Sequence, residues 1–313
     1  MVKYIDQQKG INMKALSRLL AAAAIAAVFA GCATMSRPAH DTLIAHRGES
    51  VDAPENTLPA YRLAVERGFG FECDLYLSKD GRVFTFHDGD LSRTTDGQNK
   101  SRCSDVSWED TVSKLDVGSW GKWKGSEFAG THPALLEDVL ALARDGRRIY
   151  LEVKAGPEIA PVLKSVLSAQ TAATPRNVLF ISFKKEVCGA IKDAMPEYTV
   201  YLLSSLAEGT TPESLAQAAR EARADGVDVR FDANVVTEEF VAAVKAEGLS
   251  FHVWTLDELP LVLRAFAVGA DTVTTNCAKQ RYDEYCALYA PQAEERDEFS
   301  DRIQDGAAFP VFR

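Results

Sequence analysis

Ionisable side chains interrupt several short apolar segments of the sequence, at positions where an unpaired buried charge would be costly. Their types suit acid–base and metal chemistry, and they are His46, Arg47, Glu72, Asp74, His87, Glu152 and Lys154. Two histidines can exchange protons near neutral pH. Three carboxylates without enough nearby Lys or Arg to pair them all favour a hard divalent cation, and oxygen ligands alone favour Ca²⁺ or Mg²⁺ over zinc. Taken singly, however, a strand-end His or Arg is more often a structural residue.

Short β-rich segments alternate with amphipathic segments along most of the chain. The predicted strands are 43–45, 69–77, 83–86, 148–153, 178–183, 199–203, 226–231, 250–255 and 271–274. The predicted helices between them are 58–67, 135–144, 159–169, 185–195, 212–224, 238–247 and 259–268, several of them followed by a glycine. Such alternation predicts a parallel sheet, here a (β/α)8 TIM barrel of α/β class over residues 43–290. In such a barrel, polar side chains at the carboxyl ends of strands meet in one site.

The ninth strand is one too many for an eight-stranded barrel, and a hairpin explains it. Asp80-Gly81 between two β-rich segments is a strong hairpin signal. Two residues cannot return the chain to a parallel neighbour, so these two strands are expected to be antiparallel. A two-residue turn would make Asp74 and His87 direct cross-strand partners, with Glu72 on the same face because side chains alternate along a strand.

Residues 94–133 do not follow the alternation. The segment is polar and carries Trp108, Trp120 and Trp123, so we expect an inserted cap after the strand of His87. The tryptophans either cover the pocket or supply the core of the insertion, and the second interpretation is preferred because aromatic residues usually form the core of a small subregion.

The N-terminal segment has the pattern of an export signal. Basic residues precede a short apolar run, Leu19–Ala30, which is too short to span a bilayer. This pattern predicts a signal peptide over residues 1–31 and a tether over residues 32–42. Phe29–Cys32 resembles the bacterial lipoprotein processing box, which implies lipidation of Cys32. We therefore expect an exported protein of the bacterial cell envelope, lipid-anchored in a membrane facing the periplasm and touching the membrane only through that anchor.

The overall charge and the cysteines exclude some classes of function. The formal net charge is −10, which makes nucleic acid an unfavourable partner. Six cysteines contain no C-x-x-C pair, which argues against a structural zinc site. Cys277 and Cys286 are close in sequence, and whether they form a disulfide is left open. Residues 291–313 form an acidic tail without a clear pattern.

A series of short motifs, taken in order, resembles the glycerophosphodiester phosphodiesterase family. The motifs are His46-Arg47-Gly48, Glu55-Asn56-Thr57, Glu72-x-Asp74, Lys79-Asp80-Gly81, Phe86-His87-Asp88, Arg93-Thr94-Thr95-Asp96-Gly97, Glu152-Val153-Lys154, Ser182-Phe183, Val253-Trp254-Thr255 and Thr275-Asn276. The resemblance covers about residues 43–277. It implies a barrel of the phosphatidylinositol phospholipase C type and metal-dependent hydrolysis of a small-molecule glycerophosphodiester to sn-glycerol 3-phosphate and an alcohol.

The resemblance also implies roles for individual residues. The metal, Ca²⁺ or Mg²⁺, would be held by Glu72, Asp74 and Glu152. The catalytic residues would be the acid/base pair His46 and His87, with Arg47 bracing the phosphoryl oxygens. Lys154 would add charge at the phosphate, and Trp254 would form a wall beside the glycerol. Glu55 has two further interpretations, as a carboxylate near the metal and substrate or as an anchor for Arg47, beside a purely structural one at the start of a helix. In this family the glycerol hydroxyl of the substrate is thought to attack phosphorus, giving a cyclic phosphate that water then opens.

Two other functions fit parts of the pattern. A sphingomyelinase D-like phosphodiesterase uses a related barrel and a similar His and Glu-x-Asp set, but the long segment between His87 and Glu152 argues against it. A non-catalytic, lipid-anchored protein that binds glycerophosphodiesters would need the metal and Arg47 but not two histidines.

Overall fold

The computed structural model describes residues 40–144 and 146–289 of the 313-residue chain. The predicted signal peptide, the lipidation site Cys32, most of the tether and the tail over residues 291–313 lie outside the described residues. Among the helices that the structure describes, none is long and apolar enough to cross a membrane.

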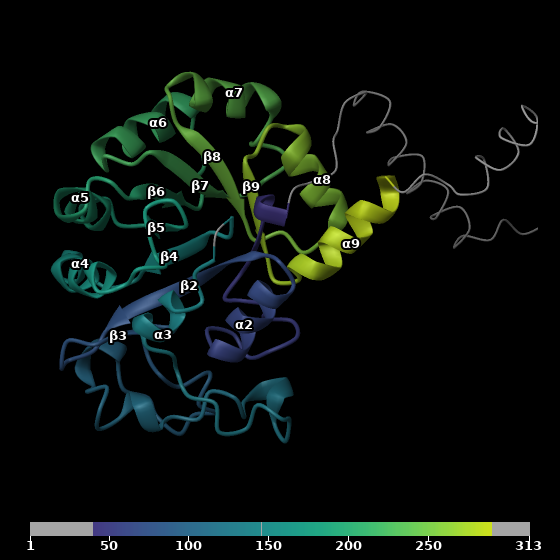
Figure 1. Cartoon of the computed structure of the whole chain (residues 1–313). Helices are drawn as coiled ribbons and strands as arrows, with labels where there is room; N and C mark the ends of the chain where they lie inside the picture. The colour runs from purple at the N-terminus through teal and green to yellow at the C-terminus, as the bar shows by residue number, and fades with distance from the viewer. Residues whose placement is uncertain (1–39, 145, 290–313) are drawn as a thin grey trace, which may run out of the picture.

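Nine strands form one sheet that closes on itself (Figure 1). They are β1 (Leu43–Ala45), β2 (Gly70–Leu77), β3 (Val83–Thr85), β4 (Ile149–Val153), β5 (Val178–Ser182), β6 (Thr199–Ser204), β7 (Gly226–Arg230), β8 (Ser250–Trp254) and β9 (Thr272–Thr275). The order is β1-β9-β8-β7-β6-β5-β4-β2, with β2 returning to β1, and every pair in this ring is parallel. β3 pairs antiparallel with the C-terminal part of β2, from Leu75 to Leu77. The predicted (β/α)8 barrel with one additional hairpin strand is confirmed.

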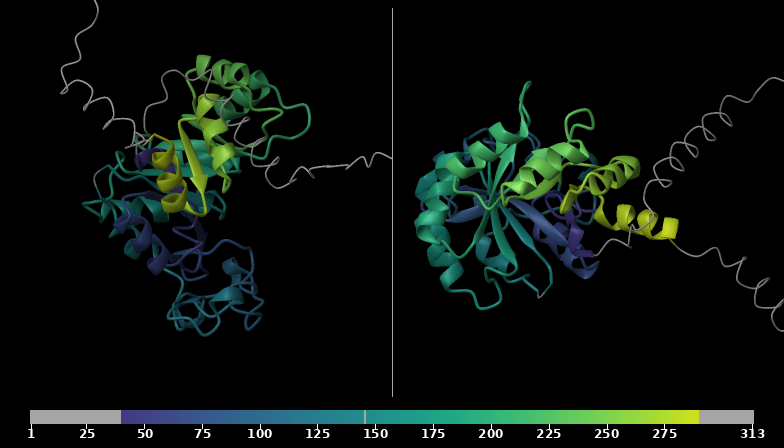
Figure 2. Two further views of the ribbon diagram at one scale, coloured as in Figure 1. Left: turned by 90° about the vertical axis from the view of Figure 1, so that its right-hand side faces the viewer. Right: turned by 90° about the horizontal axis from the view of Figure 1, so that it is seen from above.

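Helices pack around the outside of the ring, as Figures 1 and 2 show. They are α2 (Leu58–Glu66), α3 (Leu136–Leu140), α4 (Ala160–Ser168), α5 (Lys185–Ala194), α6 (Pro212–Glu221), α7 (Glu238–Ala246), α8 (Leu259–Ala267) and α9 (Ala278–Tyr289). Thr57, Thr211 and Thr237 begin three of them, each accepting a backbone N–H with its hydroxyl oxygen. Such N-caps each stabilise a helix by about 1 kcal/mol.

The register of the hairpin differs by one residue from the prediction. The structure pairs Leu75 with Thr85 and Leu77 with Val83, so Asp74 faces Phe86 rather than His87. The reason is a longer turn, in which Gly81 has a φ of +79° and Ser78 N–H donates to Arg82 O at 2.9 Å. The turn therefore contains three residues, and the two-residue turn that we expected was wrong.

Side chains of the ring strands alternate between two apolar layers. On β4, Leu151 and Val153 join the large core beneath the helices, whereas Tyr150 lies in the barrel interior. The interior layer contains Ile44, Tyr150, Leu179, Ile181, Tyr201 and Leu203. This packed interior fills the lower part of the barrel, so that charged side chains on the same inward face lie above it, toward the carboxyl ends of the strands.

The segment between β3 and α3 forms a separate lobe below the barrel in Figure 1, also seen in the left view of Figure 2. It contains three short 3₁₀ helices, Cys103–Asp105, Val112–Lys114 and Gly121–Trp123. Trp108 packs against Phe84 at 6.1 Å between ring centroids, and Trp123 packs against Phe128 at 5.3 Å. Trp108 and Trp123 are therefore packing residues of the insertion, in agreement with the preferred interpretation.

The structure answers the open question of the Cys277–Cys286 pair and corrects the predicted end of one helix. Cys277 and Cys286 do not form a disulfide with each other. Cys277 directly precedes α9 and Cys286 lies within it, and nine residues of helix span about 13 Å, too far for a disulfide. Among the glycines that follow predicted helices, Gly226 does not close α6 but begins β7, and Arg223 takes the left-handed conformation at the end of α6, with a φ of +57°.

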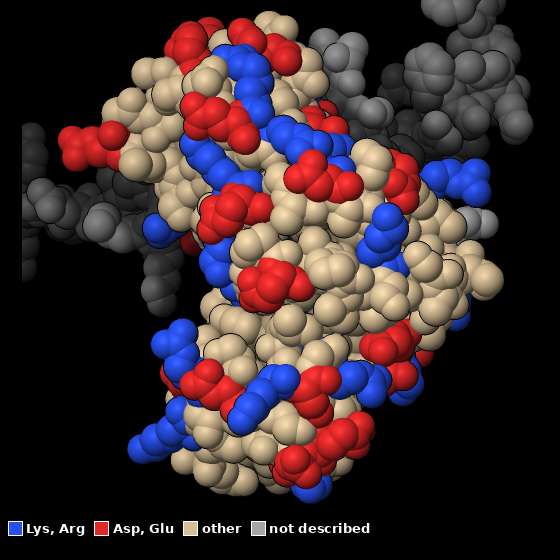
Figure 3. All heavy atoms as spheres, turned by 90° about the vertical axis from the view of Figure 1, so that its left-hand side faces the viewer, with Lys and Arg blue, Asp and Glu red and all other residues tan. Residues whose placement is uncertain are grey.

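Charges of both signs are mixed over the surface. On the face drawn in Figure 3, Lys and Arg side chains are interspersed with Asp and Glu rather than gathered into one large basic patch. Such mixing leaves no extended surface of a single sign on this face.

Candidate active site

A cavity of about 310 Å³ opens at the carboxyl ends of the barrel strands. Its lining contains His46, Arg47, Glu72, His87, Glu152, Lys154, Ile181, Phe183, Leu203, Asp228, Trp254, Thr255 and Thr274. Seven of the nine residues singled out by the sequence therefore line one cavity. Asp74 lies buried beside it, and Glu55 lies behind Arg47.

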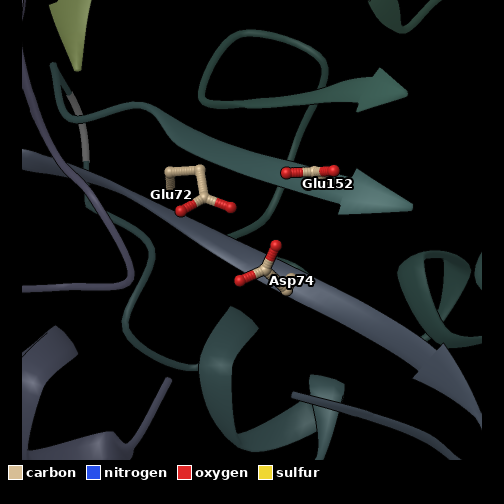
Figure 4. A group of neighbouring side chains, drawn as sticks. All are labelled: Glu72, Asp74 and Glu152. Carbon is tan, nitrogen blue, oxygen red and sulfur yellow. The ribbon is translucent and has the colours of Figure 1, made fainter. Parts of the chain in front are cut away.

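Three carboxylates converge at one side of this cavity. Glu72 and Asp74 lie two residues apart on β2, and the register places Asp74 beside Glu152 of β4. Figure 4 shows the three side chains directed toward a shared space, and one ligand oxygen from each lies within 4.8 Å of the others. Residues on neighbouring parallel strands are this close because the strands are about 4.8 Å apart.

The carboxylates have unused capacity to bind a cation. Glu72 Oε1, Asp74 Oδ1 and Glu152 Oε1 are buried and accept no hydrogen bond of normal geometry from the described residues. Two basic groups lie close by: Lys154 Nζ is 3.0 Å from Asp74 Oδ1 and 2.5 Å from Glu152 Oε1, and Arg47 Nε is 3.4 Å from Asp74 Oδ2. Three acidic groups therefore face two basic ones, and a hard divalent cation fits this oxygen-only donor set.

The pKa values of the three acids differ because their neighbours differ. Burial, followed by repulsion from Asp74, raises the pKa of Glu152 to about 7. The same two causes, with Glu152 added, hold the pKa of Glu72 well above its usual range. For Asp74, burial is outweighed by Lys154 and Arg47, which lower its pKa. A cation among the oxygens would relieve the repulsion that raises the first two values.

His46 is held in a fixed orientation at the end of β1. Its Nδ1 lies 2.7 Å from Asn276 Oδ1, and Asn276 in turn donates from Nδ2 to Asp257 Oδ2 at 2.6 Å. Because an amide oxygen can only accept, the proton of a neutral His46 lies on Nδ1. Nε2 then carries a free electron pair, 4.0 Å from Glu72 Oε2. Burial, and then Arg47, lower the pKa of His46 to about 4, so the ring is neutral at pH 7.

His87 is held by a carboxylate instead of an amide. Its Nδ1 lies 2.7 Å from Asp88 Oδ1, and Arg93 Nε donates to Asp88 Oδ2 at 2.6 Å. Both rings of the cavity are therefore oriented through Nδ1, His46 by a neutral amide oxygen and His87 by a carboxylate.

Glu55 contacts two arginines. It accepts from Arg47 Nη1 at 2.8 Å and from Arg93 Nη2 at 2.7 Å, and it is not one of the converging carboxylates. Of the interpretations left open by the sequence, the structure matches the anchor for Arg47. Arg93, at the start of the insertion, binds both Glu55, the partner of Arg47, and Asp88, the partner of His87.

Two further polar residues of the site, like Asn276 and Arg93, received no role from the sequence. Asn56 donates to Asp74 Oδ2 at 2.7 Å and accepts from the backbone N–H of Asp74 at 3.1 Å, with a φ of +57°. Asp228 on β7 is 1% exposed and lines the cavity floor. The signal for Asp228 was present: it is an acidic residue at an inward position of an otherwise apolar strand.

Aromatic side chains form one wall of the cavity. Trp254, at the end of β8, donates from its indole N–H to Asp228 O at 3.1 Å. Phe183 packs edge-on against this indole, with 5.7 Å between ring centroids, and is 46% exposed. The wall combines a fixed indole with an exposed ring at the mouth.

Comparison with known proteins agrees with this geometry. The profile of the glycerophosphoryl diester phosphodiesterase family matches residues 46–279. The chain belongs to this family. It is therefore an enzyme, a phosphoric diester hydrolase, and the resemblance noted from the motifs is confirmed.

Individual members of the family match most of the chain. A glycerophosphodiester phosphodiesterase of Caldanaerobacter subterraneus is 30% identical over 241 residues, covering 75% of this chain and 93% of the relative. One of Bacillus subtilis is 30% identical over 249 residues, covering 74% and 82%. An Oleispira antarctica phosphodiesterase, solved with its product sn-glycerol 3-phosphate, superposes with a TM-score of 0.68 at 26% identity, covering 79% of this chain and 96% of that one.

Proposed function

We propose that this phosphodiesterase hydrolyses glycerophosphodiesters to sn-glycerol 3-phosphate and an alcohol, with Ca²⁺ or Mg²⁺ held by Glu72, Asp74 and Glu152. The observation that carries the proposal is the pairing of a carboxylate cluster with two oriented histidines in one cavity. The names of the relatives support the substrate class.

The proposed roles follow from the positions of the side chains. The bound cation would supply positive charge to the phosphoryl oxygens. Arg47 and Lys154 line the same cavity and add two fixed positive charges for those oxygens. Their attraction is strong there because the cavity wall is largely apolar and its effective dielectric constant is lower than that of water.

His46 and His87 would share the proton transfers. His46 is neutral with Nε2 free, so it accepts the proton of the attacking hydroxyl, which in our proposal is the glycerol hydroxyl next to the phosphoester. His87, supported by Asp88, delivers a proton to the departing alkoxide. The two histidines then exchange roles while water opens the cyclic phosphate: His87 accepts the proton of the water, and His46 returns its proton to the glycerol oxygen. Proton transfer by a positioned side chain contributes about 10²- to 10⁴-fold to rate.

The two rival functions receive less support. A binding protein has no need for two imidazoles that are each oriented through Nδ1 in the same cavity. A sphingomyelinase D-like enzyme would not need the large lobe between β3 and α3 that supplies Arg93.

The decisive assay follows release of sn-glycerol 3-phosphate from glycerophosphocholine by the mature chain. The assay is run with a chelator, and then with Ca²⁺ or Mg²⁺ restored. Release that stops with the chelator and returns with the metal supports reaction and cofactor together. Binding of metal and substrate without release would favour the binding protein instead.

Export and lipidation at Cys32 remain proposals. They rest on the apolar run Leu19–Ala30 and on the motif that ends at Cys32. Mass spectrometry of the protein from the membrane fraction tests them: a mature chain beginning at an acylated Cys32 is expected, and Cys32→Ser should remove the acyl group. An unprocessed N-terminus in cells would contradict both.

A further inference from the structure

Asp228 has a position that the proposed chemistry does not use. It lies in the middle of β7 and points inward, between Gly226 and Arg230 of the same face. It is 1% exposed, and its Oδ1 is buried without a hydrogen-bond partner in the part of the chain that the structure describes. A buried polar atom in this state costs about 1–3 kcal/mol, so a bound molecule that supplies the partner recovers this free energy.

The barrel topology places Asp228 opposite the carboxylate cluster. In the ring β1-β9-β8-β7-β6-β5-β4-β2, four steps separate β7 from β2 in either direction. β2 carries Glu72 and Asp74, so the cavity extends from these acids on one side of the barrel to Asp228 on the other. A diester whose phosphate lies at the carboxylate cluster has one substituent directed across the barrel floor and the other toward the open mouth.

The floor around Asp228 is closed below. Ile181 and Leu203 line it, and Tyr150 and Tyr201 fill the barrel beneath. Its one polar neighbour in the sheet register is His252 of β8, a buried ring stacked on Tyr201. Such a closed end fits the small invariant part of a family of substrates, whereas alcohols of different size require the open mouth beside the exposed ring of Phe183. In a glycerophosphodiester the invariant part is glycerol.

The protonation state of Asp228 favours a neutral partner. Burial, followed by repulsion from Glu152, raises the pKa of Asp228 to about 8. A neutral carboxyl group can both donate to and accept from a hydroxyl, but it gives little attraction to an ammonium group. The floor therefore suits a polyol better than a cationic alcohol.

We propose that Asp228 hydrogen-bonds the terminal hydroxyl of the substrate's glycerol and so makes the enzyme selective for diesters whose glycerol is not acylated or otherwise blocked at that carbon. The inference rests on the proposed function and adds to it a specificity-determining residue. A substrate without this hydroxyl leaves the buried carboxyl group unpartnered. Sites that hydrogen-bond a hydroxyl discriminate strongly against analogues that lack it.

The test compares two substrates with the wild-type enzyme. The first is glycerophosphocholine, and the second is its analogue in which the terminal CH₂OH is CH₃. The analogue keeps the hydroxyl next to the phosphoester, so the attacking group is unchanged. We expect kcat/KM to be about 10- to 100-fold higher for glycerophosphocholine. Equal values for the two substrates would overturn the inference without any variant.

Variants locate the preference at Asp228. Asp228→Leu should lower kcat/KM for glycerophosphocholine by about 10- to 100-fold while changing that for the analogue less than about twofold, so that the preference disappears. Asp228→Asn, which keeps hydrogen-bonding atoms of the same shape, should retain most of it. The control is Asp232→Asn, an exposed change in the loop after β7 outside the cavity lining. Circular dichroism checks that each variant is folded.

The outcomes separate this inference from the proposed function. If Asp228→Leu slows both substrates equally, or if Asp228→Asn behaves like Asp228→Leu in a folded protein, the specificity role is wrong while the phosphodiesterase remains. If the wild-type enzyme releases choline from neither substrate, the proposed function fails, and this inference fails with it.

Discussion

His46 Nδ1 lies 2.7 Å from the amide oxygen of Asn276, and the amide nitrogen of Asn276 lies 2.6 Å from a carboxylate oxygen of Asp257. The neutral amide separates the imidazole from the negative charge of Asp257. It orients the ring through a neutral acceptor, whereas Asp88 places a carboxylate at Nδ1 of His87. The difference between an amide and a carboxylate at Nδ1 leads to the first prediction.

Asn276→Asp should move the acidic limb of the pH profile to higher pH. The pKa of His46 is lowered from 6.5 to about 4, so the neutral base persists down to about pH 4. A carboxylate at Nδ1 stabilises the imidazolium and raises this pKa, by about one to three pH units. Measuring kcat/KM from pH 4 to 9 checks the shift. Identical acidic limbs in the variant and the wild type would argue against His46 as the base.

The two histidines should be needed for turnover but not for metal binding. His46→Ala and His87→Ala should each lower kcat by about 10²- to 10⁴-fold, because each removes one proton transfer. Calorimetric titration with Ca²⁺ should give nearly the wild-type affinity, since neither ring belongs to the carboxylate cluster. Wild-type turnover in either variant would refute the assignment, and His132→Ala, on the exposed surface of the insertion, is the matched control.

Metal should stabilise the folded chain through the three carboxylates. At a concentration 100 times the dissociation constant, a ligand that binds the folded state alone adds about 2.7 kcal/mol. Thermal unfolding with and without Ca²⁺ or Mg²⁺ should therefore show a higher Tm with metal, and Glu152→Gln should reduce both this increase and kcat. The exposed change Glu186→Gln on α5 should leave the increase intact. An increase that survives in Glu152→Gln would place the cation elsewhere.

Gly48 of the His46-Arg47-Gly48 motif should be needed for folding stability. Its φ is +80°, and an added Cβ would lie 2.6 Å from the backbone of Ala60. Gly48→Ala should lower the free energy of unfolding by about 2–5 kcal/mol. Gly81→Ala is the control, because Gly81 has a similar φ of +79° with open space around it, and it should lose only about 1–2 kcal/mol. Equal losses in urea titrations would show that the contact with Ala60 carries no cost.

The fold was predictable because the sequence pattern of a strand followed by a helix is repeated around the ring. Each strand has an apolar outer face and each helix an amphipathic pattern, so an error of one residue at an end leaves the barrel unchanged. The β2–β3 hairpin was not predictable to the residue, because Asp80-Gly81 fits both a two-residue and a three-residue turn. Even so, His87 reaches the cavity, since it lies beyond the end of β3 and is not bound to the sheet register.

The site was predictable where a charge interrupts an apolar strand and not where the role depends on a neighbour. Glu72, Asp74 and Glu152 could be detected because each is a charged residue within a predicted apolar strand. Asn56 and Asn276 act by orienting another side chain, which is a relation between distant positions that one sequence does not reveal. Asp228 could be noticed in the sequence as a charged residue in a strand, but its proposed role in specificity depends on the closed cavity floor around it.

Arg93 has a consequence for how this enzyme tolerates change in its insertion. Its guanidinium binds both Glu55 and Asp88, and the rest of the lobe follows it in sequence. Replacing the whole lobe with that of a relative would remove these contacts, and the supports of Arg47 and His87 would loosen together. A chimera joined after residue 97 keeps Arg93 and exchanges only the outer part of the lobe. The boundary between exchangeable architecture and the catalytic centre thus lies inside the insertion, a few residues after it begins.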